Sequence, residues 1–100
     1  MVQDPDDKFY DRADAHIHLS NDQMTGVSRG EVSASMMYAT ARFNAWVSAC
    51  GFAGGEQMKV ARDETIEYFV TEFRKMLEDN LDDYISNHEG YMRMPPPEDA

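Results

Sequence analysis

Apolar residues recur at helical spacing in three segments of this chain, with an acidic or polar face opposite the apolar one in the first and third. The spacing predicts helices near residues 5–24, 29–50 and 63–88. No segment shows the strict alternation of a half-buried strand. We therefore predict an all-α fold with three main helices in a small bundle.

Residues that start and stop helices flank these segments. Asp4 and Pro5 suit the cap and the first position of the first helix. Ser28 and Glu31 have the spacing of a capping box, in which each side chain accepts a hydrogen bond from the other residue's amide. Gly90 predicts a glycine cap beyond the end of the third helix.

The central segment is apolar or small on two opposite faces. The larger face carries Val32, Met36, Ala39, Phe43, Trp46, Val47 and Cys50. The smaller face carries Ala34, Ala41, Ala45, Ser48 and Ala49. Such a helix has to be covered twice. We therefore expect a second copy of the chain to complete the bundle, in a homo-dimer or a higher homo-oligomer.

The chain is expected to form one helical domain over residues 1–90. Residues 51–62 form a linker whose second half, 56–62, could take a loose helical turn. Residues 91–100 contain three consecutive prolines and are predicted to be a flexible tail.

Composition narrows the class of protein. The 100 residues include 19 acidic and 9 basic ones, for a net charge of −10, which disfavours nucleic acids and anionic membranes as partners. Cys50 is the single cysteine, so no intramolecular disulfide forms. No apolar run is long enough for a membrane span, and no secretory leader opens the chain. We expect a cytoplasmic protein.

One string suggests a metal site, but its helical context argues against it. Asp14, His16 and His18 alternate as in the first metal-binding strand of amidohydrolases. On a helix, however, the two histidines point about 160° apart and cannot share an ion. We predict no metal and no cofactor, and we expect His16 to lie on the buried stripe of the first helix. Cys50 is expected to be an inert thiol on an apolar face.

A polar pocket near Arg42 is the candidate ligand site. Arg42 flanks the small face of the central helix, where it either pairs with a carboxylate or anchors an anion. Tyr38, Asn44 and His16 are the candidate polar lining of such a pocket. No nucleophile, base and orienting group occur together in a pattern that predicts catalytic residues.

Four acids close to the predicted end of the third helix form a candidate partner surface: Glu78, Asp79, Asp82 and Asp83. Acids near a helix C-terminus oppose the helix dipole and repel one another. They form a solvated face, a contact for a basic protein or a weak divalent-cation surface, although the spacing of a calcium-binding loop is lacking. Asn80 interrupts the apolar stripe, where it either sets register or is partly exposed.

Several strings resemble a small bacterial family catalogued as a domain of unknown function. They are Phe9-Tyr10-x-Arg12-Ala13-Asp14, the run Val32-Ser33-Ala34-Ser35 with Tyr38-Ala39-x-x-Arg42-Phe43-Asn44-Ala45, and Ile66-Glu67-Tyr68-Phe69 with Met76-Leu77-x-x-Asn80-Leu81-Asp82-Asp83-Tyr84. The resemblance spans about Phe9 to Ile85 and implies a small, soluble helical protein without an assigned reaction. The leading hypothesis is a non-enzymatic interaction or scaffold protein. The alternative is an enzyme or small-ligand binder with a polar pocket near Arg42.

Overall fold

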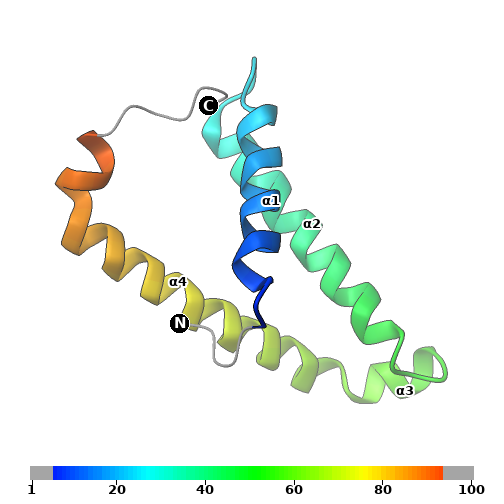
Figure 1. Cartoon of the computed structure of the whole chain (residues 1–100). Helices are drawn as coiled ribbons and strands as arrows, with labels where there is room; N and C mark the ends of the chain where they lie inside the picture. The colour runs from blue at the N-terminus through cyan, green and yellow to red at the C-terminus, as the bar shows by residue number, and fades with distance from the viewer. Residues whose placement is uncertain (1–5, 94–100) are drawn as a thin grey trace.

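The computed structural model describes residues 6–93, and this part of the chain is all-α (Figure 1). Its helices are α1 (Phe9–Gln23), α2 (Arg29–Ala49), α3 (Gly55–Val60) and α4 (Arg62–Arg93). The all-α part of the predicted fold class is confirmed. The loose turn expected in the second half of the linker is the short helix α3.

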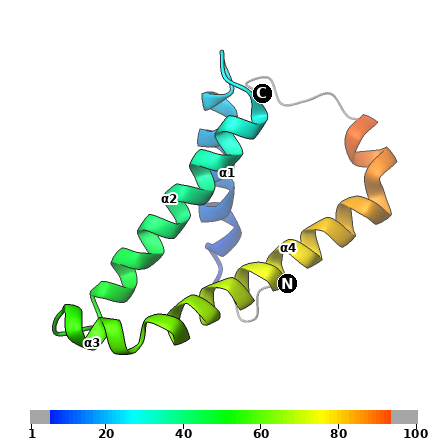
Figure 2. The same ribbon diagram turned by 180° about the vertical axis from the view of Figure 1, so that it is seen from behind.

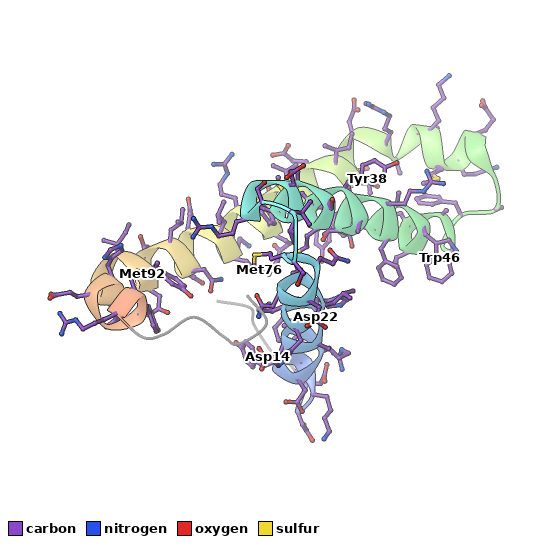
Figure 3. All side chains as sticks on the ribbon, turned by 90° about the horizontal axis from the view of Figure 1, so that it is seen from above. Asp14, Asp22, Tyr38, Trp46, Met76 and Met92 are labelled. Carbon is purple, nitrogen blue, oxygen red and sulfur yellow. The ribbon has the colours of Figure 1, made fainter. Side chains whose placement is uncertain are left out.

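The helices form an open arrangement rather than a closed bundle. α1 lies antiparallel beside α2, and α3 makes a corner from which α4 diverges from α2 (Figures 1 and 2). Seen from above, α1 and α4 leave α2 in different directions (Figure 3). The radius of gyration is 16.5 Å, against about 13 Å for a compact domain of 100 residues.

In the described part of the chain, full burial is confined to one residue near the start of α2. Val32 is the one buried residue among those described, with 6% of its surface exposed. Next to it, the Ser20 hydroxyl of α1 donates a long hydrogen bond to the Met36 sulfur of α2, at 3.8 Å. The large face of α2 is otherwise uncovered, since Phe43 and Trp46 are each 62% exposed. The described helices therefore do not bury the large face of α2.

The capping box at the start of α2 is confirmed. The Glu31 amide donates to the Ser28 hydroxyl at 3.1 Å, and the Ser28 amide donates to the Glu31 carboxylate at 3.0 Å. The hydrogen bond from the Ser28 amide lowers the pKa of Glu31 below its usual value. The stabilisation from this ionised carboxylate is complete at neutral pH and is lost as pH falls through the lowered pKa.

Replacing Ser28 by alanine should lower the free energy of unfolding by about 1 kcal/mol, because the Glu31 amide loses its acceptor. The matched control is Ser35→Ala, an exposed serine inside α2, which should be neutral or slightly stabilising because alanine favours helix. Urea denaturation of both variants at pH 7 checks the difference. Equal losses in the two variants would contradict a capping role.

The start of α1 differs from the prediction. The helix begins at Phe9 with Lys8 as its cap residue, and Asp4 and Pro5 lie outside the described residues. Asp6 organises this end instead, since its carboxylate accepts from the Lys8 amide at 3.0 Å and from both Arg12 guanidinium nitrogens, at 3.1 and 2.7 Å. The Arg12 hydrogen bonds hold the pKa of Asp6 below its usual value.

The C-terminal end of α4 also differs, because the helix continues to Arg93. Gly90 is helical, so the predicted glycine cap is wrong, and Tyr91 to Arg93 belong to the helix rather than to a tail. The rest of the predicted tail, 94–100, lies outside the described residues. The helix kinks at Asn87, whose φ of −121° and ψ of 20° are not helical.

Asp83 fixes this kink from one turn earlier. The Asn87 amide group donates to the Asp83 carbonyl at 3.0 Å and to its carboxylate at 2.9 Å. The Tyr91 hydroxyl donates to the other carboxylate oxygen at 2.8 Å, which raises the pKa of Tyr91. Asp83 therefore links both sides of the kink, which keeps the last helical turns in place beyond the non-helical residue.

Candidate functional site

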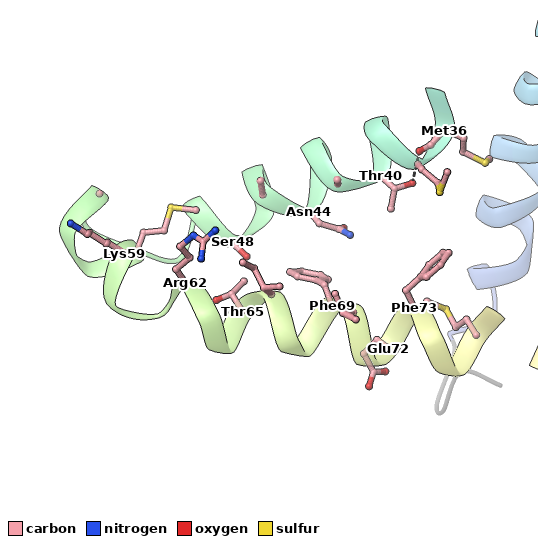
Figure 4. Close-up of a pocket in the computed structure, with 18 residues that line it drawn as sticks. Met36, Thr40, Asn44, Ser48, Lys59, Arg62, Thr65, Phe69, Glu72 and Phe73 are labelled. Atoms are coloured by element: carbon pink, nitrogen blue, oxygen red, sulfur yellow. Dashed lines mark hydrogen bonds between the residues drawn. The ribbon is translucent and has the colours of Figure 1, made fainter. Parts of the chain in front are cut away.

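A cleft of about 830 Å³ lies between α2 and α4 (Figure 4). The α2 wall presents small side chains, including Ala41, Ala45 and Ser48. The α4 wall presents large ones, including Ile66, Phe69, Phe73 and Met76. The small face predicted on the central helix therefore lies opposite the predicted stripe of the last helix, without being closed by it.

The polar groups of the cleft are few, and several are already occupied. The hydroxyls of Thr40 and Thr65 donate to backbone carbonyls one turn earlier in their own helices, each at 2.8 Å. Glu72 is directed away from α2 (Figure 4) and accepts from Lys75 at 3.1 Å. The cleft is therefore a mainly apolar surface, suited to binding apolar side chains rather than to proton transfer.

Two basic residues mark the end of the cleft at the corner formed by α3. Lys59 lies on α3 and Arg62 opens α4, and both line the cleft (Figure 4). Arg62 also pairs with the exposed Asp63 at 2.8 Å. Sequence reasoning missed this basic end, because it treated residues 51–62 as a linker. The helical spacing of Ile66 and Phe69 did identify the α4 wall.

Only one of the four predicted ligand-binding residues lies in the cleft. Asn44 lines it, whereas Tyr38, Arg42 and His16 do not. Tyr38 is 70% exposed and Arg42 is exposed, without an ion pair among the described residues. His16 is exposed too, so its predicted place on a buried stripe is wrong. The structure therefore does not assemble a polar pocket around Arg42.

The residues considered for metal binding and the single thiol do not form a site either. Over residues 6–93, no three His, Cys, Asp or Glu side chains come together in a group that could hold a metal ion. Cys50 is an exposed free cysteine at the C-terminal cap of α2, so its predicted burial on an apolar face is wrong. None of the helices in the described range is long and apolar enough to cross a membrane.

The acidic cluster lies on exposed turns of α4, shortly before the kink at Asn87. Asp82 and Asp83 stand about one turn before the kink, and Glu78 and Asp79 stand about two turns before it, so the helix dipole acts mainly on the first pair. Asp83 holds the kink described above. Asn80 is exposed, and its amide donates to the Met76 carbonyl at 2.7 Å, as expected of partial exposure rather than of a buried register residue.

Fold and cleft together define a small, open, all-α protein whose longest helix stands away from a helical pair. The family model described as "Protein of unknown function (DUF3144)" matches residues 9–85, and the chain belongs to this family. The match confirms the resemblance drawn from the sequence strings. It assigns no reaction and no binding site.

A solved structure has a similar fold. It is described as the NMR structure of the protein NB7890A from Shewanella sp, and it is 38% identical to this chain. The alignment covers 94% of this chain and 100% of that one, with a TM-score of 0.74. No curated protein matches the chain.

Proposed function

We propose that this chain is a non-enzymatic helical interaction protein that binds another protein through the apolar faces of α2 and α4. One observation carries the proposal: among the described residues only Val32 is buried, while Met37 of α2 and Phe73 of α4, which both line the cleft, are 56% and 47% exposed. Large contiguous apolar surfaces on soluble proteins mark sites of association.

The acidic residues of α4 and the single thiol extend this proposal. Glu78, Asp79, Asp82 and Asp83 lie on the same helix as the apolar wall and supply a polar rim suited to basic groups on the partner. Cys50 is exposed, which suits a reducing cytoplasm where a lone thiol stays reduced.

Capture from a bacterial lysate with the tagged full chain tests this function when paired variants are compared. Ala45→Glu places a charge on the small wall of the cleft, and Ala15→Glu makes the same change on an exposed position of α1 outside the cleft. We expect proteins held by the wild type and by Ala15→Glu to be lost from Ala45→Glu. The proposal fails if Ala45→Glu retains the same proteins in the same amounts, or if the wild type holds none.

A small-ligand binder is the second candidate, because the volume of the cleft lies within the range of ligand pockets. A thermal-shift screen with metabolites and metal ions tests it. A ligand in the cleft should raise the melting temperature by several degrees, and Asn44→Ala should reduce that shift. Arg42→Ala is the matched control, because Arg42 does not line the cleft. A shift that Arg42→Ala removes and Asn44→Ala retains would place the ligand elsewhere.

A further inference from the structure

The chain exposes far more surface than a compact protein of its mass. Its exposed area is 8678 Å² for 11.4 kDa, against about 5,800 Å² for a compact monomer. Even if the residues outside the described range accounted for half of the excess, the rest would exceed the roughly 800 Å² that each partner contributes to a standard protein interface. The uncovered area therefore matches a protein partner, and a small ligand would leave most of it exposed.

A partner would cover apolar surface that the folded chain leaves exposed. A single buried residue, Val32, does not make a core, so the described arrangement depends on cover from outside the chain. A second copy of the chain is always present with the first, and at the same concentration. Formation of a two-fold dimer also covers the cleft of each copy at once, since a two-fold interface uses the same surface on both copies.

The apolar seam of α4 is suited to packing against a second α4 that runs antiparallel to it. Ile66, Phe69, Phe73 and Met76 recur at spacings of three and four residues, which is the pattern of a helix–helix seam, and Leu77 follows Phe73 by four. If a second α4 runs antiparallel and crosses at Phe73, Phe69 of one copy lies level with Leu77 of the other. Large apolar side chains then face each other on both sides of the crossing point.

One basic residue on the seam, Arg62, favours this antiparallel direction. Arg62 stands at the beginning of α4, while Asp82 and Asp83 stand 20 and 21 residues further along the same helix. In an antiparallel pair centred on Phe73, Arg62 of one copy lies level with Tyr84 of the other, next to Asp82 and Asp83, and these two acids lie level with Glu64 and Asp63. In a parallel pair, acids would face acids along the distal half, which disfavours that alignment.

We propose that α4 of a second copy of this chain fills the α2–α4 cleft, in a two-fold dimer whose axis passes near Phe73. This inference rests on the proposed function, because it names the partner of the same cleft. Ala41 and Ala45 let the incoming helix approach the α2 backbone closely. The basic group that the acids of α4 meet is then the Lys59 and Arg62 end of the other copy.

The mass of the full chain in solution tests the dimer. Light scattering at micromolar concentration should give twice 11.4 kDa for the wild type and for Ala15→Glu. Ala45→Glu should weaken the dimer at least tenfold, because the new carboxylate would be buried against the incoming helix. A wild-type mass of 11.4 kDa, or an Ala45→Glu dimer as tight as the wild type, overturns the proposal.

A disulfide test with an unaltered α2 wall checks the direction and the register. In a Cys50→Ser background, Phe73→Cys should form a disulfide-linked dimer on mild oxidation, since the two copies of this position meet at the axis. Val60→Cys is the control, because it lies on α3, beyond the start of α4 at Arg62, and the two copies of Arg62 are about 33 Å apart along the paired helices. Cross-linking at position 60 and not at position 73 overturns the antiparallel dimer, even if Ala45→Glu does not fold.

The outcomes separate this dimer from the more general function. A monomeric wild type whose captured proteins are lost in Ala45→Glu overturns the dimer and leaves the interaction function standing. A monomeric wild type whose captured proteins are unaffected by Ala45→Glu overturns both.

Discussion

Replacing Val32 by aspartate is expected to detach α1 from α2 and to lower the free energy of unfolding by more than about 3 kcal/mol. The variant loses the burial of a valine side chain, worth roughly 1.5–3 kcal/mol. It also places a carboxylate where only 6% of the native residue is exposed, and the loss of hydration adds to the cost. Urea denaturation followed by circular dichroism measures the change.

Val60→Asp provides the matched control, because it makes the same substitution at a valine that is 88% exposed. The new acid lies at the last residue of α3, so we expect a loss of no more than about 1 kcal/mol, mostly from the helix dipole. Similar losses in the two variants would mean that Val32 does not hold the helical pair together.

Two glycine replacements should change stability in opposite directions. Gly26, in the turn between α1 and α2, has a φ of +84°, in the left-handed region that side chains rarely adopt. Gly26→Ala should therefore destabilise the protein by about 1–2 kcal/mol, although nothing lies within 4 Å of the added carbon. The penalty is backbone strain rather than a steric clash.

Gly90→Ala is the counterpart, with equally open space around the added carbon. Gly90 lies within α4, so alanine should favour the helix by up to about 1 kcal/mol. Thermal and urea denaturation of both variants, together with helix content from circular dichroism, check the two signs. A destabilised Gly90→Ala would indicate that this turn is a glycine cap, as the sequence alone suggests.

Features that depend on residues close together in the sequence, such as the capping box, were predictable. Features that depend on side-chain hydrogen bonds in the folded chain, such as the kink in α4, were not. Ser28 and Glu31 stand three residues apart, so the sequence contains everything that their capping box needs. At the kink, the Asn87 side chain donates hydrogen bonds to Asp83, and the helix continues past Gly90. Glycine is a poor helix former, and a pattern of single residues gives no indication of such a bond.

For the candidate site, the residues of the cleft walls were predictable, but the arrangement of the two walls was not. The small face of α2 and the large stripe of α4 follow from helical periodicity, and both line the cleft. Periodicity does not give the angle between two helices, so it could not show that the cleft stays open. Arg42 failed as a cleft residue because it follows Ala41 by about 100° around the helix, which turns its side chain out of the cleft.

The corner at α3 allows a small rotation of the backbone there to move the far end of α4 by a large distance. The stretch from Arg62 to the kink at Asn87 is a continuous helix roughly 37 Å long, and it joins α3 through the single residue Ala61. Turning this arm by about 10° around the corner would move its far end by roughly 6 Å. The backbone dihedrals of a few residues around Ala61 therefore set the width of the cleft, so substitutions there should alter binding without touching either wall.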